Sequence, residues 1–463
     1  MARISRRALG VAAVCAAVVS LVAGHAPARG ADVPKKAPDP KAGGAVCEWT
    51  SAGGVVCFWR APQKYDAAKG ANLTLILHGS NLSHGWGFAN HDAKTFRPDD
   101  MVVCPDGTTP AGKGAFNFLE GDTRKAHALL EELKKTMKVR QVFLYGHSQG
   151  SFFSLAWAGD FPDDVDGLVA HASGLWASSQ TGPKGHRQAI VLMHGTQDPV
   201  VPYTQSVGGF DALREANYPT VRLRSLEGWN HWPAELNGPV PHTSQQLAWV
   251  EGMTTTDADR LKVSFDLLSD VNGETAAEHD FAGLWSLAGR VATMESAPAD
   301  LKARAAKAKQ QVETLAAAHV AALALPDKLT FDKKPWIGHL PVFLRAFQGV
   351  PAREELAKKL EDVLATHKKD AVAHLRKYYG ALKQDKKDDA FAEGVAAIQS
   401  GWLWCECWDQ EVRKNLREWR KDAKKLKLSK ESLKAYDAVF EDFEKALTEG
   451  WKSFEAAQKK FGN

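Results

Sequence analysis

Several features that would assign this chain to a common functional class are missing or scarce. No run of lysine and arginine is dense enough to indicate a nucleic-acid-binding surface, and the formal net charge is only +4. Cysteine is rare, with six in 463 residues. Cys405 and Cys407 have no second cluster that would complete a metal or redox site, so helix packing is the better interpretation of this pair. We therefore expect neither a nucleic-acid partner nor a bound metal.

The apolar run near the N-terminus is too short to favour a membrane span. It follows the basic stretch MARISRR and precedes the small residues Ala26-Pro27-Ala28, an arrangement typical of an export signal with a cleavage site. The pair Arg6-Arg7 resembles a twin-arginine signal. An uncleaved membrane anchor is the alternative. We expect residues 1–30 to be an export signal, and the mature protein, without a membrane span, to act in the periplasm or outside the cell.

Five cysteines remain after this segment, and an odd number leaves at least one thiol unpaired in an oxidising compartment. Cys47 and Cys57 flank the stretch EWTSAGGVV, in which Gly53-Gly54 suits a hairpin turn. Two cysteines on neighbouring strands of a hairpin are candidates for a cross-strand bridge. We therefore expect a disulfide between Cys47 and Cys57.

The distribution of apolar residues divides the chain in two. Residues 31–44 form a linker rich in proline, lysine and glycine. From residue 45 to 256, short apolar runs alternate with amphipathic helical patterns, which predicts an α/β fold: a mostly parallel sheet covered by helices on both faces. The strand candidates, in chain order, are VVCFWR, LTLILHG, MVVCPDG, QVFLYG, GLVAHASG, AIVLMHG and VRLRSLEG. Ligand sites of open α/β sheets gather at the carboxyl ends of the strands.

Residues 257–463 have a different character, with fewer glycines, no strand candidates and more frequent lysine. Amphipathic patterns at helical spacing recur, and Pro351 opens one of them where a first-turn proline is tolerated. No fixed-period repeat is evident, so we expect an all-helical domain, an irregular bundle first and a helical solenoid second. Its tryptophans are core residues, which their spacing favours, or an aromatic platform for a polymer: Trp402, Trp404, Trp408, Trp419 and Trp451.

The stretch FLYGHSQGSFFSLAW contains the pentapeptide Gly146-His147-Ser148-Gln149-Gly150. It follows an apolar strand pattern and opens a helical one, which is the placement that a G-x-S-x-G nucleophile elbow requires. The two glycines relieve crowding around a strained serine, and the helix N-terminus favours developing negative charge. The pattern predicts Ser148 as a nucleophile, the alternative being a buried small residue at a helix start. His147, its neighbour in a tight turn, is expected to pack rather than react.

A serine hydroxyl needs a base to take its proton, and the base needs an acid to orient it. In this fold class the partners follow in the order serine, acid, histidine. Asp198 in VLMHGTQDPVVPY and His231 in LRSLEGWNHWP each follow a predicted strand in that order. We therefore predict Asp198 as the acid and His231 as the base. The weaker alternatives are His242 for the base and three residues for the acid: Asp163, Asp164 and Asp166.

Two backbone amides must hold the oxyanion of the intermediate. One should come from Gln149, which follows the nucleophile, and the other from the loop LHGSN, where Ser80 is favoured over Asn81. Trp86 and Phe88 either line a wall of the substrate pocket or cover the core. Three nearby histidines are separated by six and seven residues, which is no recognised zinc-ligand pattern: His78, His84 and His91.

Five stretches, in this order, resemble the α/β-hydrolases: LILHGSN, VVCPDG, LYGHSQGSFFSLAWAGDFPDDVDGLVAHASG, IVLMHGTQDPVVPY and LEGWNHWP. The chain is most similar to the carboxylesterase branches, namely the phospholipase/carboxylesterase type and the group of polyhydroxybutyrate depolymerases and feruloyl esterases. The resemblance spans about two hundred residues, ends near residue 253, and implies the same three residues as nucleophile, acid and base. The chain departs from it in GHSQG, where those enzymes have GFSQG, and in Ser151, where they often have glycine.

These features predict an exported serine hydrolase that cleaves a small-molecule or polymeric carboxylic ester through an acyl-enzyme, without a cofactor. A serine peptidase on the same fold is one alternative, but peptide substrates usually bring a propeller or a lid, and neither is visible. A binding or scaffold protein that engages a protein or the cell envelope through residues 257–463 is the other. The intact set of Ser148, Asp198 and His231 argues against it.

Overall fold

The protein is described by a computed structural model that covers residues 33–176, 187–232, 242–269, 280–325, 329, 336–401 and 410–459. Several sequence predictions lie outside these residues: the export segment, Cys405, Cys407, Trp402, Trp404, Trp408 and the side chain of Trp451. No described helix is both long and apolar enough to cross a membrane.

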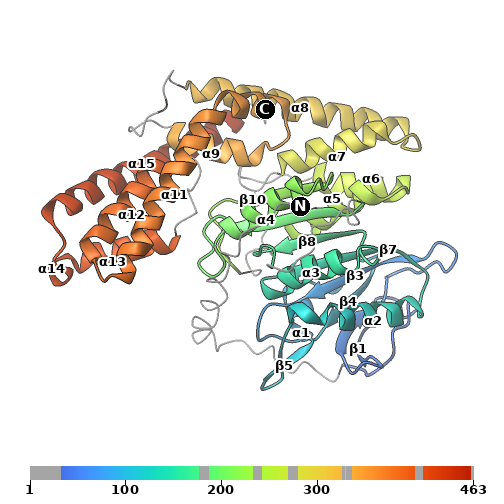
Figure 1. The fold of residues 1–463 in the computed structure, drawn as a ribbon. Coiled ribbons are helices and arrows are strands. Elements are labelled where there is room, and N and C mark those ends of the chain that lie inside the picture. Colours follow the sequence, from blue (N-terminus) through green and yellow to red (C-terminus); the bar gives the residue numbers. More distant parts are fainter. Residues whose placement is uncertain are drawn as a thin grey trace, which may run out of the picture. The chain divides into compact units, whose positions relative to one another are not determined.

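An eight-stranded sheet forms the centre of the first half of the chain, in the order β1-β2-β4-β3-β7-β8-β9-β10 (Figure 1). Its strands are β1 (Val46–Thr50), β2 (Val56–Arg60), β3 (Ala71–Leu77), β4 (Met101–Pro105), β7 (Val139–His147), β8 (Gly167–His171), β9 (Ala189–Gly195) and β10 (Val221–Leu226). β3 pairs in parallel with β4 and β7, and the ladder continues in parallel through β8 and β9. Within this sheet, the antiparallel pairs among the described registers are β1–β2 and β2–β4. The predicted, mostly parallel sheet is confirmed.

Helices cover this sheet on both faces. Every residue of β3, β4, β8 and β9 is buried, and because successive side chains of a strand point to opposite faces, neither face of these strands meets solvent. Both α3 and α5 pack against β7 and β8. The helices of this part are α1 (Gly85–Asn90), α2 (Thr123–Lys134), α3 (Gln149–Asp160), α4 (Thr204–Glu215) and α5 (His242–Thr254), with a 3₁₀ turn at Glu120–Asp122.

A small hairpin of β5 (Thr109–Gly112) and β6 (Ala115–Asn117) was not predicted from the sequence. Its strands are four and three residues long, too short for an apolar alternation to stand out. The turn between them is built from three residues with positive φ: Gly112, Lys113 and Gly114. The hairpin matters because it carries Asn117 next to the loop that follows β3, where its side chain meets Asn81.

The predicted disulfide between Cys47 and Cys57 is wrong in this structure. Both thiols are buried and unbridged. The ladder of β1 and β2 pairs Cys47 with Trp59 and Cys57 with Trp49, so the two cysteines are offset by two residues along the hairpin rather than directly opposite. A cross-strand bridge needs a closer approach than this diagonal provides. Burial, helped by nearby carboxylates, raises the pKa of the Cys57 thiol, which keeps it protonated.

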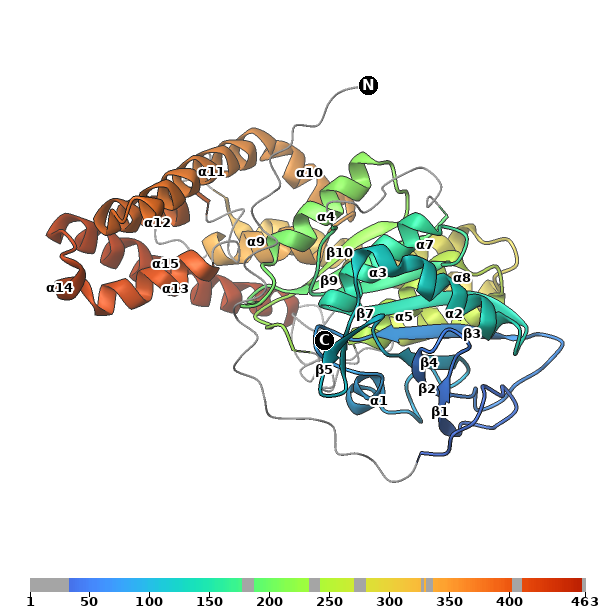
Figure 2. The same cartoon turned by 60° about the horizontal axis from the view of Figure 1, so that its bottom comes forward.

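The second half of the chain is helical, as predicted. Its helices are α6 (Ala258–Ser269), α7 (Phe281–Thr293), α8 (Ala299–Leu323), α9 (Trp336–Ala346), α10 (Pro351–Lys359), α11 (Glu361–Lys383), α12 (Lys387–Gly401), α13 (Gln410–Lys421), α14 (Ala423–Leu426) and α15 (Lys430–Lys459). In Figure 2, α11 and α12 lie side by side, with α13 and α15 against α12. Pro351 stands at the start of α10, where its missing N–H costs no hydrogen bond.

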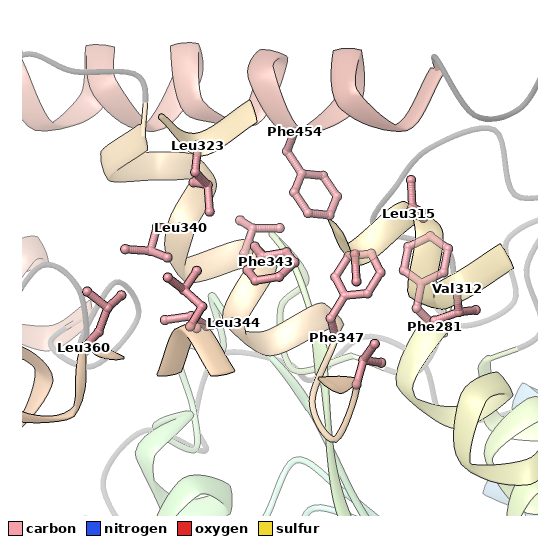
Figure 3. Packing of buried hydrophobic residues seen from close by; sticks show 14 of the residues in the cluster. Phe281, Val312, Leu315, Leu323, Leu340, Phe343, Leu344, Phe347, Leu360 and Phe454 are labelled. Atoms are coloured by element: carbon pink, nitrogen blue, oxygen red, sulfur yellow. The ribbon is translucent and has the colours of Figure 1, made fainter. Parts of the chain in front are cut away.

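Two apolar clusters hold these helices together. In the first, Phe343 of α9 and Phe347, in the turn just after this helix, lie with Phe454 of α15, and residues of α7 and α8 complete the cluster (Figure 3). The second joins α11, α12, α13 and α15 around Tyr378 and Phe391, and Trp419 packs against it. Trp419 is therefore part of a core, as the helical spacing of the tryptophans favours.

The chain separates into two compact units, and their boundary does not follow the sequence simply. The first unit contains Met1–Met193, Gln205–Leu223 and His231–Thr254. Two short segments, His194–Thr204 and Arg224–Asn230, belong to the second unit together with Thr255–Asn463. The segment that carries Asp198 thus groups with the helices that follow residue 254.

Candidate active site

Ser148 occupies a sharp turn between β7 and α3. Its backbone has a φ of 52° and a ψ of −119°, a combination that non-glycine residues rarely adopt. The Ser148 amide donates to the carbonyl of His171, and the Ser148 carbonyl accepts from the Ser151 amide as the first turn of α3 closes. The side chain is only half-buried. The turn therefore presents the hydroxyl at the carboxyl end of β7, while the backbone is held from both sides.

Gly146 and Gly150 are required by the space around this turn. A Cβ on Gly146 would lie 2.6 Å from the Cα of Ser151, and one on Gly150 would lie 2.3 Å from the carbonyl oxygen of Leu77. Real Cβ atoms do not approach backbone atoms so closely, so any side chain at either position would force the strands or the helix apart.

The loop after β3 runs close to Ser148. A Cβ on Gly79 would be 3.4 Å from the Cβ of Ser148. The next residue, Ser80, is exposed. The amide of Asn81 donates to Oδ1 of Asn117 at 2.9 Å, so it is already engaged with the β5–β6 hairpin. The amide of Asn81 is therefore directed to the hairpin rather than left for another partner at this loop.

Gln149 begins α3, so its backbone N–H is at the positive end of the helix. Its side chain accepts a hydrogen bond from the amide of Phe118 at 3.0 Å. That bond joins the start of α3 to the segment after the β5–β6 hairpin. The side chain of Gln149 thus has a structural partner on that segment.

His147 is buried among aromatic rings and other histidines. Its ring stacks on Trp86 with 5.2 Å between centroids, and the ring of His231 is 4.8 Å away. Its Nδ1 lies 3.0 Å from Nδ1 of His171. Burial, reinforced by the neighbouring histidines, holds the pKa of His147 well below its usual value, so the ring is neutral.

His231 is thereby placed next to the elbow, since its ring meets that of the residue before Ser148. The side chain is 2% exposed, and its other ring neighbour is Trp232. The rival base His242 is the first residue of α5 and is fully buried in its packing.

Asp198 lies in the turn after β9, within the second unit. It is 2% exposed. Its Oδ1 accepts hydrogen bonds from the amides of Val200 and Val201 at 2.8 and 2.9 Å, and its Oδ2 is 3.2 Å from Nε2 of His194. Both carboxylate oxygens of Asp198 are thus engaged by residues of its own segment.

The alternative acids have structural partners of their own. Asp164 accepts from the indole of Trp157 and from His127. Asp166 accepts from the amide of Val142, and Asp163 is almost fully exposed. None of the contacts named here joins these aspartates to Ser148 or His231.

Trp86 and Phe88 both belong to α1. Trp86 stacks on His147, which brings it to the elbow. Phe88 is half-buried on the same short helix.

The histidines near α1 are engaged separately from one another. His78 accepts from the amide of Gly107 through Nε2, His84 is bonded to Asp106, and His91 packs against Phe96. Among the described residues, one group has ligand atoms at metal-like spacing: His127, Glu131 and Asp164. Lys134 forms ion pairs with both carboxylates of this group, so a fixed cation already balances it.

His171 was missed in the sequence. It is the last residue of β8 and stands in register with His147, the last residue of β7. Ligand sites of parallel sheets gather at the carboxyl ends of the strands, and His171 ends a predicted strand. That position was the signal that could have identified it.

Comparison with known proteins agrees with this topology. Residues 118–236, which are 119 of the 463 in the chain, match a family described as Phospholipase/Carboxylesterase. The matched range contains Ser148, Asp198 and His231. Together with the strand order, the match confirms the expected α/β-hydrolase-type fold of this part of the chain. No curated protein matches the chain.

Several solved structures are similar to part of this chain at low identity. A carboxylesterase from Bacillus cereus is 16% identical, with a TM-score of 0.35 and coverage of 42% of this chain and 93% of that one. An acyl-protein thioesterase from Zea mays is 16% identical, with a TM-score of 0.34 and coverage of 43% and 99%. A feruloyl esterase module from Clostridium thermocellum is 12% identical, with a TM-score of 0.33 and coverage of 41% and 81%.

Proposed function

We propose that this protein is an exported serine hydrolase that cleaves carboxylic esters through an acyl-enzyme. The observation that carries the proposal is the backbone of Ser148, with its φ of 52° between β7 and α3. A strained serine between two glycines that admit no side chain is the arrangement of a nucleophile elbow, and a packing site has no need of it. The match of residues 118–236 to an esterase family supports the ester as substrate class.

In the first half of the reaction, His231 takes the proton of Ser148 as the hydroxyl oxygen attacks the ester carbonyl. The negative charge that develops on the carbonyl oxygen is held by the amides of Gln149 and Ser80. Ser80 is assigned this role because the competing amide, that of Asn81, is bonded to Asn117. Asp198 orients His231 and stabilises its charged form. His231 then gives its proton to the leaving alcohol.

In the second half, water attacks the acyl-enzyme with His231 again as the base, and the acid is released as Ser148 regains its proton. Neither half needs a cofactor. Trp86, which stacks beside the elbow, forms one wall of the pocket for the acyl or alcohol part, and Phe88 extends that wall.

Export is part of the proposal and rests on the basic, apolar and small-residue pattern of residues 1–30. N-terminal sequencing of the protein secreted by a bacterial host tests it. A mature chain that starts near residue 31 is expected, and a full-length chain retained in the cytoplasm would contradict export.

A fluorophosphonate probe tests the catalytic role, with p-nitrophenyl acetate and longer esters assayed in parallel. Ser148→Ala should lose both labelling and turnover, by about 1,000-fold or more. Ser151→Ala is the matched control, because this buried serine is three residues away and donates to the carbonyl of His171. It should still label.

Other outcomes separate the alternative functions. Labelling at Ser148 with cleavage of peptides but not esters would make the protein a serine peptidase. A folded native protein that does not label contradicts the enzyme and leaves a binding role for the helices.

A further inference from the structure

Two loops of the proposed site are joined to each other. We call residues 195–201, which carry Asp198, the acid loop, and residues 226–230, which lead directly into His231, the base loop. The amide of Thr196 donates to the carbonyl of Leu226, and the amide of Gln197 donates to the carbonyl of Trp229. In return, the amide of Gly228 donates to Oγ1 of Thr196. The two loops therefore form one hydrogen-bonded piece, and a shift of either one moves both.

The backbones of the two loops lie so close together at Gly195 that no side chain fits between them. A Cβ on Gly195, at the start of the acid loop, would lie 2.3 Å from the carbonyl oxygen of Trp229 and 2.4 Å from that of Asn230. His231 follows Asn230 by one peptide bond. The position of the base loop thus determines where the backbone of the proposed base begins.

One residue of the helical region, Arg345, forms an ion pair with the base loop. Arg345 of α9 forms a two-pronged ion pair with Glu227 of the base loop: Nε lies 2.5 Å from Oε1, and Nη2 lies 2.9 Å from Oε2. The two side chains are 15% and 12% exposed. A bidentate pair that is largely shielded from water fixes both distance and direction, which an exposed pair does not.

The position of Arg345 is fixed by the packing of α9. Phe343 and Leu344 of α9, and Phe347 in the turn that follows it, are buried in the first apolar cluster of the helices (Figure 3). Because α9 is packed between α8 and α15, the guanidinium group is held by a core rather than by a mobile surface. Both short loop segments group with these helices as one compact unit.

We propose that Arg345 is a positioning residue for catalysis: through Glu227 it holds the joined acid and base loops in the arrangement that the reaction needs. This inference rests on the proposed function of Ser148, Asp198 and His231. It assigns the helices after residue 254 a role in the chemistry, as the support of two loops of the hydrolase site.

The test compares Arg345→Gln with Arg420→Gln in the full-length protein. Arg420 of α13 is the control because it forms a bidentate pair with Asp437 of α15 inside the same helical region, and neither residue belongs to the acid loop or the base loop. Arg345→Gln should slow fluorophosphonate labelling and ester turnover by about 10- to 100-fold, with little change in KM, because a misplaced base weakens the chemical step more than binding. Arg420→Gln should match the wild type.

Rescue distinguishes positioning from a general loss of stability. Arg345→Lys keeps the charge but not the fork, and should recover only part of the rate. The double variant Arg345→Glu/Glu227→Arg restores the pair with reversed charges, and should label faster than either single variant. If the double variant is no better than the singles, the ion pair itself does not position the site.

Hydrogen exchange provides a readout that needs no activity. The amides of Thr196 and Gln197, which join the loops, should exchange faster in Arg345→Gln than in the wild type or Arg420→Gln. Unchanged exchange with an unchanged labelling rate overturns the proposal, and so does faster exchange without slower labelling. If the wild type fails to label, the proposed function is wrong, and the exchange rates alone decide whether Arg345 holds the loops.

Discussion

His147 and His171 face each other through their Nδ1 atoms at a distance of 3.0 Å. They are the last residues of two neighbouring parallel strands and stand in register. A contact between two ring nitrogens requires that one carries a proton and the other does not. Burial keeps His147 neutral, and the contact lies at the carboxyl ends of β7 and β8, next to the turn of Ser148.

His147→Phe tests whether this histidine takes part in the chemistry. We expect activity toward p-nitrophenyl esters to stay within about tenfold of the wild type, since loss of a general base costs about 100-fold or more. The free energy of unfolding should fall by about 1–3 kcal/mol, because His171 loses a buried hydrogen-bond partner. Ester turnover and urea unfolding measure the two effects. If a folded variant turns over esters about 100-fold more slowly than the wild type, His147 is part of the catalytic machinery.

Gly150→Ala should destabilise the protein by about 3 kcal/mol or more, because the new Cβ would lie 2.3 Å from the carbonyl oxygen of Leu77. The matched control is Gly208→Ala on α4, where nothing lies within 4 Å of the new methyl group. That variant should gain about 0.5–1 kcal/mol, as alanine is the better helix former. Thermal unfolding checks both. Equal midpoints for the two variants would contradict the geometry of the elbow.

Arg97 should contribute far more to the free energy of unfolding than a surface arginine does. It pairs with Asp100 and Glu251, and the three side chains are 5%, 0% and 1% exposed. Arg97→Met leaves two buried carboxylates without their cation and should cost about 3–5 kcal/mol in the free energy of unfolding. Arg304→Met removes an ion pair with Asp266 whose side chains are 42% and 27% exposed, and it should cost less than about 1 kcal/mol. Urea titration of both variants measures the difference, and similar losses would refute it.

The helical region should lose stability as the pH falls below about 6.5. Nδ1 of His319 lies 2.9 Å from Nε2 of His339, whose Nδ1 lies 3.1 Å from the hydroxyl of Ser453. Burial lowers the pKa of His319 to about 3 and that of His339 to about 4. In the unfolded chain both return to about 6.5. As the pH falls from about 6.5 to about 4, the unfolded state therefore takes up protons that the folded state does not, and the free energy of unfolding decreases.

The variant His319→Leu/His339→Leu isolates this effect from that of other buried histidines. Its urea midpoint should depend less on pH between about 7 and 4 than the wild-type midpoint does. His319 also packs against Phe343, Phe347 and Phe454, so the leucines keep an apolar contact at these sites. An unchanged pH dependence would show that the pair does not titrate on unfolding.

Much of the fold followed from local patterns. The run ANLTLIL is apolar almost throughout because β3 is buried on both faces, and such a run predicts a central parallel strand. On α2, Ala126, Leu129, Leu130 and Leu133 recur in the sequence at helical spacing and are buried. Both are properties of neighbouring residues along the chain, so the sequence expresses them directly.

Features that depend on how strands align did not follow. Cys47 and Cys57 flank a good turn, yet the register offsets them. Ser80 was favoured over Asn81 from the sequence, but the hydrogen bond from the Asn81 amide to Asn117 of the β5–β6 hairpin was not foreseen. In each case the deciding partner lies on another element, and residue spacing carries no information about it.

The sequence by itself determined the strand–turn–helix around Ser148, because glycines at two fixed positions and an apolar strand before them leave the backbone little choice. It also determined the order in which Asp198 and His231 follow. Only the tertiary structure decided that the acid loop and the base loop are one piece held by Arg345, since Glu227 and Arg345 are 118 residues apart. A contact over that separation depends on where α9 packs, and packing is a property of the whole helical core.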